Sequence, residues 1–281
     1  MPVRITKFRE MKRAGEPIPC ITAYDYPTAK LADAAGIPLI LVGDSLGNVV
    51  LGFGSTVHVT MDDMVRHTQA VVRGASEALI VADMPFMSYQ ASIEDAVRNA
   101  GRLVQEAGAH AVKLEGGKSV ADAVERITEA GIPVLGHLGL TPQSVNQLGG
   151  YRIQGRTLPQ AQEMLEDAEA LEAAGAFGIV LESVPGPLAQ VVTKCLRVPT
   201  IGIGAGAGCD GQIQVLHDVL GLSDRLPKHG KQYANLKQII EEALAAYAGD
   251  VRDRNFPTAE HTTEIDDAVL RELMGDVPID R

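Results

Sequence analysis

Tryptophan is absent from the chain of 281 residues, and aromatic residues make up only 4% of it. The apolar fraction of 46% must therefore come mainly from Leu, Val, Ile and Ala, which predicts a globular protein with a large aliphatic core. Basic residues are also in the minority, since the formal net charge is −11. This balance argues against nucleic-acid binding, which normally leaves a basic footprint on a protein.

Cysteine is equally scarce. Cys20, Cys195 and Cys209 show no C-x-x-C spacing, which argues against a zinc or redox site. An odd number of thiols is typical of a reducing compartment, so we expect a cytoplasmic protein. Residues 1–17 lack the apolar segment of a secretory signal, and no apolar run approaches the roughly 20 residues that span a bilayer. We therefore expect no association with a membrane.

Four short apolar runs each lead directly to an acidic residue. Buried parallel strands have continuous apolar sequences, and the carboxyl ends of all strands in an α/β barrel lie on one face. The four acids are therefore expected to converge on one site. The runs are LILVGD at Leu39–Asp44, LIVAD at Leu79–Asp83, AVKLE at Ala111–Glu115 and FGIVLE at Phe177–Glu182.

Helical patterns ended by glycine separate these runs, which predicts parallel βαβ units. About eight such units favour a closed (β/α)8 TIM barrel, which commonly takes about 250 residues. Strands are expected at 19–24, 39–42, 79–82, 111–114, 134–138, 177–181 and 200–203, and strand eight is assigned to 219–222. The main helices are expected at 5–14, 25–35, 62–75, 92–107, 120–130, 158–174, 188–196 and 235–248.

The barrel domain is expected to span residues 1–249, with a short helix at 5–14 that closes its bottom. Residues 250–281 are charged and polar, and we expect a C-terminal tail or packing arm there. Two glycine-containing segments, 48–60 and 143–156, show no clear period. Connections of this length in a compact barrel tend to be lids or binding loops.

Asp44, Asp83 and Glu115 form an oxygen-rich set without a His or Cys cluster, which suits Mg²⁺ better than Zn²⁺. Each acid could instead cap a helix or lie in a solvated loop. Lys113 lies two residues before Glu115, on the same side of its strand. Because a buried lysine needs an anionic partner, Lys113 could bind a substrate carboxylate, form a Schiff base or make a structural ion pair.

Glu182 ends the sixth strand, apart from the other acids. An isolated carboxylate in a partly apolar pocket has its pKa raised toward the range useful for proton abstraction, although a salt-bridged loop residue is the alternative. His137 in GHLGL is a possible accessory acid, base or hydrogen-bond donor, but a lone histidine is more often structural. Ile201–Gly211 contains G-x-G-x-x-G, which we interpret as a tight loop because the other features of a dinucleotide fingerprint are weak.

Long motifs in the chain resemble the 3-methyl-2-oxobutanoate hydroxymethyltransferase (ketopantoate hydroxymethyltransferase) family, and they cover most of residues 6–257. They are TAYD at Thr22–Asp25, VGDSLGNVVLG at Val42–Gly52, VTMDDMVRHTQAV at Val59–Val71, VADMPFMSY at Val81–Tyr89, VKLEGG at Val112–Gly117, GHLGLTPQSVNQLGGYRIQGR at Gly136–Arg156, LES at Leu181–Ser183, IGIGAGAGCDGQ at Ile201–Gln212 and HDVLGL at His217–Leu222.

The resemblance implies a TIM barrel of the phosphoenolpyruvate-mutase-like group. It implies transfer of a hydroxymethyl group from 5,10-methylenetetrahydrofolate to 3-methyl-2-oxobutanoate, giving 2-dehydropantoate for pantothenate biosynthesis. Glu182 corresponds to the family's proton acceptor, and the family is typically a homodecamer. One Mg²⁺ per subunit would be held by Asp44, Asp83 and Glu115, some of them through water, and the oxo acid would be bound by Asp44, Ser45, Asp83 and Lys113.

Departures from the family pattern lie outside these matched residues. Val57-His58 replaces a more usual Leu-Pro, Pro227–Gly230 departs from a PKF-type run, and residues past Pro257 look like an added tail. A Mg²⁺-dependent C–C lyase of the isocitrate-lyase type is the alternative function, but its characteristic K-x-C-G-H motif is absent. A class I aldolase using Lys113 and a non-enzymatic oligomeric scaffold are weaker alternatives.

Overall fold

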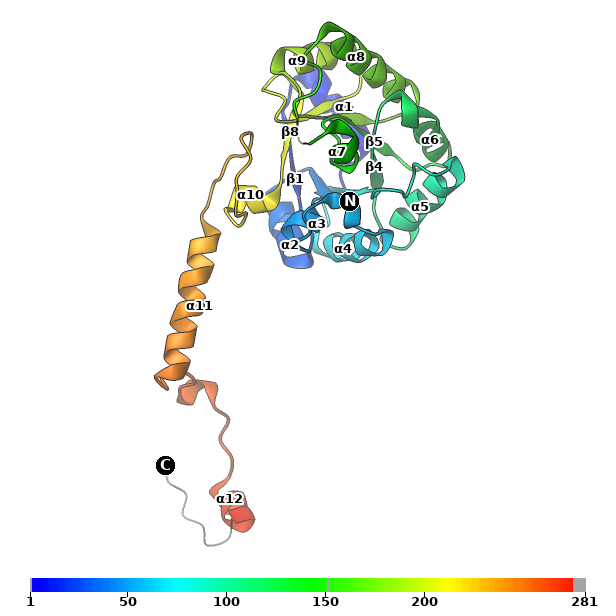
Figure 1. The fold of residues 1–281 in the computed structure, drawn as a ribbon. Coiled ribbons are helices and arrows are strands. Elements are labelled where there is room, and N and C mark those ends of the chain that lie inside the picture. Colours follow the sequence, from blue (N-terminus) through cyan, green and yellow to red (C-terminus); the bar gives the residue numbers. More distant parts are fainter. Residues whose placement is uncertain (1, 151, 275–281) are drawn as a thin grey trace. The chain divides into compact units, whose positions relative to one another are not determined.

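The computed structural model describes residues 2–150 and 152–274, and it contains a closed barrel of eight parallel strands (Figure 1). Each strand pairs with the next one in the sequence, and β8 pairs with β1 to close the barrel. The strands are β1(Ile18–Thr22), β2(Leu39–Val42), β3(Leu79–Asp83), β4(Ala111–Glu115), β5(Val134–Gly139), β6(Gly178–Glu182), β7(Thr200–Ile203) and β8(Gly211–Gln214). The expected (β/α)8 TIM barrel is confirmed.

Helices alternate with the strands and form the outer ring of the barrel (Figure 1). Local signals begin several of them. Thr60 and Asp63 form a capping box at α4, and Asp25 caps α2 by accepting a hydrogen bond from Thr28 N. The helices of this part of the chain are α1(Ile5–Ala14), α2(Tyr26–Ala34), α3(Leu46–Val49), η1(Thr56–His58), α4(Met61–Gly74), α5(Ile93–Gln105), α6(Lys118–Glu129), η2(Pro142–Ser144), α7(Val145–Leu148), α8(Leu158–Ala173), α9(Gly186–Cys195) and α10(Leu216–Leu220).

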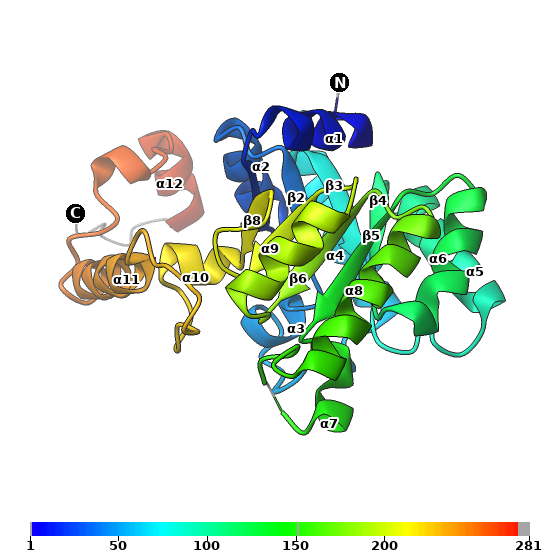
Figure 2. The same cartoon turned by 90° about the horizontal axis from the view of Figure 1, so that it is seen from above.

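The core has two layers because alternate strand residues point into the barrel and out toward the helices. Ile18, Leu41 and Val81 belong to the inner cluster, together with Phe8 of α1. The rings of Phe8 and Phe177 lie 6.3 Å apart, so α1 covers the amino-terminal end of the strands as predicted (Figure 2). Burying each such side chain contributes about 1.5–3 kcal/mol.

The assignment of strand eight to residues 219–222 is wrong. β8 is Gly211–Gln214 and begins at the last residue of the glycine-rich run, and residues 216–220 form α10. Ile213 is the only apolar branched residue of β8, so this strand lacks the continuous apolar run that identifies the others. A Cβ at Gly211 would lie 2.4 Å from Ile18 O, which explains why glycine stands where β8 meets β1.

The two segments expected to be irregular loops contain short helical turns. Segment 48–60 includes the end of α3 and all of η1, and segment 143–156 includes most of η2 and all of α7. Within residues 2–150 and 152–274, no helix has the length and apolar character needed to cross a membrane.

The chain divides into two compact units, Met1–Ala234 and Asn235–Arg281. The division precedes α11(Leu236–Arg252), whereas the sequence pattern predicts that the barrel domain ends at residue 249. None of the residues of α11 is buried, and a helical pattern alone does not show which core a helix joins. The second unit also contains η3(Ala259–His261) and α12(Asp267–Met274), and the ring of Phe256 contacts those of Tyr247 and His261.

Candidate active site

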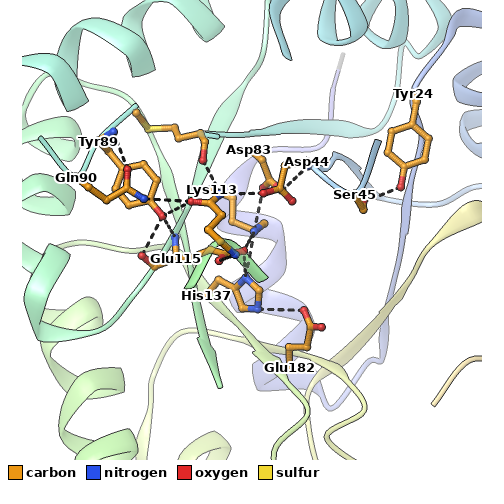
Figure 3. A network of polar contacts seen from close by, with 12 residues as sticks. Tyr24, Asp44, Ser45, Asp83, Tyr89, Gln90, Lys113, Glu115, His137 and Glu182 are labelled. Atoms are coloured by element: carbon orange, nitrogen blue, oxygen red, sulfur yellow. Dashed lines mark hydrogen bonds and ion pairs between the residues drawn. The ribbon is translucent and has the colours of Figure 1, made fainter. Parts of the chain in front are cut away.

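Polar residues at the carboxyl ends of β3, β4 and β5 form in-register pairs. Asp83 pairs in register with Lys113, and Glu115 pairs with His137. Lys113 Nζ lies 3.0 Å from Asp83 Oδ1 and 3.8 Å from Glu115 Oε1. His137 Nδ1 lies 3.2 Å from Glu115 Oε1. The register of three neighbouring strands thus produces one continuous charged network (Figure 3).

Asp44 joins this network from the residues just after β2. Its backbone N–H donates to Asp83 Oδ2 at 3.0 Å, and only 4% of Asp44 and 2% of Asp83 is exposed. Burial, followed by repulsion from Asp83 and Glu115, raises the pKa of Asp44 well above its ordinary value. Burial also raises the pKa of Asp83, and the opposing effect of Lys113 does not cancel it. A nearby cation would therefore stabilise the ionised carboxylates of Asp44 and Asp83.

Lys113 remains an ammonium ion in this environment. Burial alone would lower its pKa, but the carboxylates of Asp83, Glu115 and Asp44 outweigh burial and raise the pKa. A Schiff base forms from the neutral amine, so this charge state disfavours the class I aldolase alternative. The ion pair with Asp83 is present in the structure, which leaves binding of a substrate anion as an additional role.

His137 connects Glu182 to the acids of β3 and β4. Its Nε2 lies 3.3 Å from Glu182 Oε2. Burial and Lys113 lower the pKa of His137, but the carboxylates of Glu115 and Glu182 overcome them and raise it to about 9. The expected isolation of Glu182 is therefore wrong. The accessory candidate His137 lies at the centre of the network between two carboxylates, and its Nδ1 also lies 3.2 Å from Lys113 Nζ (Figure 3).

Glu182 is held by backbone geometry that requires glycine on the neighbouring strand. Gly139 has φ of 94°, and a Cβ there would lie 2.2 Å from Glu182 O. Leu140 N donates to the same carbonyl at 2.8 Å. The Glu182 side chain is 18% exposed, against 2% for that of Glu115. Glu182 is thus the acid of the network that is most open to a bound molecule.

Gln143 is a further site residue, and it is not among those predicted from the sequence. Its Nε2 donates to Asp44 Oδ2 at 2.9 Å and to Met84 O at 3.0 Å, and its backbone N–H donates to Glu115 Oε2 at 3.0 Å. Tyr89 Oη donates to Gln143 Oε1 at 2.8 Å. Gln143 begins segment 143–156, which is predicted to be a lid or binding loop, but no periodicity in a loop singles out this glutamine as a site residue.

The network lines a cavity of about 900 Å³ at the carboxyl ends of the strands. Ser45 also lines this cavity, and its Oγ lies 2.8 Å from Tyr24 Oη. A cavity in this place is typical of active sites in α/β barrels. It brings together all the site residues predicted from the sequence, which are Asp44, Ser45, Asp83, Lys113, Glu115, His137 and Glu182.

The donor set of Asp44 and Asp83 fits Mg²⁺. Mg²⁺ in proteins usually takes one or two carboxylates and completes its shell with waters and substrate oxygens. Asp83 Oδ1 is buried, and Lys113 Nζ lies 3.0 Å from it. Both oxygens of Glu115 contact protein groups, as do both oxygens of Asp83. In the described part of the chain, no three His, Cys, Asp or Glu side chains are arranged to hold a metal by themselves.

A family model described as ketopantoate hydroxymethyltransferase matches residues 2–259. The chain belongs to the ketopantoate hydroxymethyltransferase family. A 3-methyl-2-oxobutanoate hydroxymethyltransferase from Chloroflexus aurantiacus is 58% identical over 276 residues, which cover 98% of each chain. Another from Dehalococcoides mccartyi is 58% identical over 274 residues, covering 97% of this chain and 98% of the relative.

Solved structures show that the fold of this ketopantoate hydroxymethyltransferase family member is shared more widely. A phosphonopyruvate hydrolase has a TM-score of 0.60 at 16% identity and covers 98% of this chain and 96% of its own. A 2,3-dimethylmalate lyase, described as a member of the PEP mutase/isocitrate lyase superfamily, has a TM-score of 0.58 at 16% identity and covers 97% and 95%. These similarities confirm a phosphoenolpyruvate-mutase-like barrel.

Proposed function

We propose that the protein transfers a hydroxymethyl group from 5,10-methylenetetrahydrofolate to 3-methyl-2-oxobutanoate. Membership of the family supports this reaction, and the position of Glu182 carries the proposal for its mechanism. Glu182 is paired with His137, and its side chain is more exposed than that of Glu115, which contacts the other nitrogen of the His137 ring. A base in this place can remove the C3 proton of an oxo acid that is bound near Asp44 and Asp83.

The oxo acid would bind among Asp44, Ser45, Asp83 and Lys113. Lys113 offers a fixed positive charge to the developing anion, since its ammonium is already held by Asp83. Asp44 and Asp83 would hold one Mg²⁺, with Glu115 acting through water. When bound, this ion supplies a Lewis acid that draws electron density from the 2-oxo group.

The reaction then needs one proton acceptor and one electrophile. Glu182 takes the C3 proton while the C–H electron pair enters the enolate, and His137 orients the Glu182 carboxylate through the contact between Nε2 and Oε2. The enolate carbon forms a bond to the methylene carbon of the folate, while one of the two C–N bonds of that carbon breaks and its electron pair passes to the nitrogen, which takes up a proton; the second C–N bond is then hydrolysed. Hydrolysis consumes one water and releases 2-dehydropantoate and tetrahydrofolate. Segments 48–60 and 143–156 would exclude other water from the enolate.

Product formation tests the proposal directly. The protein is incubated with Mg²⁺, 3-methyl-2-oxobutanoate and 5,10-methylenetetrahydrofolate, and 2-dehydropantoate is followed by NMR. We expect product only when both substrates are present. Cleavage of a 2-methylisocitrate-like acid, with no response to folate, would instead support the lyase alternative. A Glu182→Gln variant that behaves as wild type in every assay would support a scaffold.

The homodecamer and the cytoplasmic location belong to the same proposal. The decamer is inferred from the family resemblance, and the location from cysteine usage. All three cysteines are free thiols in the structure. Sedimentation equilibrium tests the oligomer, for which we expect a mass near ten times the chain mass of 29.8 kDa.

A further inference from the structure

One wall of the active-site cavity carries exposed cations opposite the acids. The acids Asp44, Asp83 and Glu115 come from β2, β3 and β4, whereas Arg152, Arg225 and Lys228 lie in the segments after β5 and β8. These segments are attached to the other half of the barrel. Because the strands follow one another in order around the barrel, β6 to β8 lie across from β2 to β4.

Hydrogen bonds place both cationic segments over β6 to β8. Gln154 N donates to Ser183 O just after β6, which places the neighbourhood of Arg152 there. Gln214 at the end of β8 donates through Nε2 to His229 O at 3.5 Å. An added Cβ at Gly204, just after β7, would lie 3.1 Å from His229 Nδ1, so this side chain packs closely on the end of β7.

The three cations of this wall lack ion-pair partners among the described residues. Arg152, Arg225 and Lys228 are exposed, and none of them forms an ion pair with another residue in the described ranges 2–150 and 152–274. Asp218 and Asp224 are the acids of the same wall. Asp218 is buried and accepts a hydrogen bond from Ser223 Oγ at 2.6 Å. Asp224 also interacts with another group of the protein. The wall can therefore attract an anion.

The volume and the lining of the cavity indicate a ligand larger than the oxo acid. A cavity of about 900 Å³ is far larger than a small oxo acid requires. Besides the acids and the cations, the lining includes the apolar residues Leu140, Ile153, Val215, Leu222, Leu226 and Pro227. A matching ligand has a reactive group at one end, a mainly apolar body and carboxylates at the other end.

We propose that Arg152, Arg225 and Lys228 bind the carboxylates of the glutamyl tail of the folate, and that they favour tails with several glutamates. This inference rests on the proposed function, which makes a folate the one-carbon donor. It also gives a role to Pro227–Gly230, the segment that departs from the family pattern. The reactive end of the folate then reaches the oxo acid, which is bound near Asp44 and Asp83, while the charged end of the folate stays at the mouth of the cavity.

Steady-state kinetics with two folates test this inference. KM is measured for 5,10-methylenetetrahydrofolate with one glutamate and with three glutamates, in wild type and in the double variant Arg225→Gln/Lys228→Gln. We expect wild type to have the lower KM for the triglutamyl form. The double variant should raise that KM roughly threefold to tenfold, as expected for the loss of two exposed ion pairs, and should change the monoglutamyl KM less. The difference between the two folates should shrink as salt is added.

Lys231→Gln is the matched control. It removes one positive charge from the same stretch of chain, but Lys231 lies outside the cavity lining, with Nζ 4.7 Å from the centre of the Tyr233 ring. Equal KM values for the two folates in wild type, or an equal effect of Lys231→Gln, would overturn the inference. A failure of the proposed function would look different, because wild type would then form no product with either folate, and both proposals would fall.

Discussion

The imidazole Nε2 of His137 lies 3.3 Å from Glu182 Oε2. The other nitrogen of the same ring, Nδ1, lies 3.2 Å from Glu115 Oε1. One buried ring therefore connects Glu182, the most open acid of the network, to the acids at the ends of β2, β3 and β4. This relationship makes the site a single charged network, so that changes at one residue should affect the others.

In metal-free protein, the charge on His137 should make stability depend on pH. Its pKa is raised from 6.5 to about 9 in the folded state, so the folded state holds the proton more tightly than the unfolded state. The contribution is fully present below about pH 6.5, falls as the pH rises, and is lost above about pH 9. A shift of this size corresponds to on the order of 3 kcal/mol.

Urea unfolding in EDTA between about pH 6 and pH 10 measures this dependence. His137→Gln should remove the decline of unfolding free energy across that window. If the variant declines as steeply as wild type, the slope comes from other groups and the assigned charge state of His137 is wrong.

Lys113→Met should destabilise the metal-free protein strongly. Asp83 and Glu115 would lose their shared cation while remaining buried, and breaking a buried ion pair in this way costs about 3–5 kcal/mol. Added Mg²⁺ should recover part of the loss. Lys118→Met is the control, because Lys118 pairs with Glu166 at the surface, where solvent screens the pair and its loss costs little. Equal losses of stability in the two variants would contradict this prediction.

Gln143→Leu should weaken metal binding about 10-fold to 100-fold, because Asp44 would lose the Nε2 donor that orients it. Binding is measured with Mn²⁺ by electron paramagnetic resonance, and melting temperatures show whether the variant folds. Gln69→Leu is the control, since Gln69 donates to Glu106 O at the surface. A folded Gln143→Leu protein that binds Mn²⁺ as tightly as wild type would rule out this role.

Most strands could be predicted because their signals are local. Leu39–Val42 and Thr200–Ile203 have the expected bounds, since each is a short apolar run next to proline or glycine. β8 was missed because its backbone approach to β1 depends on Gly211 and not on an apolar run. The division before α11 was missed for a similar reason, because the apolar spacing of a helix does not show which part of the protein the helix packs against.

The site residues were predictable where a strand end carries an acid, and less so where two segments meet. Asp83 and Lys113 follow from alternation along two neighbouring strands. The contact between His137 and Glu182 depends on the reach of side chains across β5 and β6, which no spacing in the sequence describes. Gln143 acts through contacts with residues far away in the chain, such as Asp44.

Proton exchange at C3 of 3-methyl-2-oxobutanoate in D₂O, followed by NMR, tests the role of Glu182 most directly. We expect wild type to exchange this proton with Mg²⁺ and not with EDTA. Glu182→Gln should slow the exchange by about 10²-fold to 10⁴-fold, as is typical for the loss of a general base. No exchange by folded wild-type protein with Mg²⁺, or unchanged exchange in Glu182→Gln, would contradict enolisation by this carboxylate.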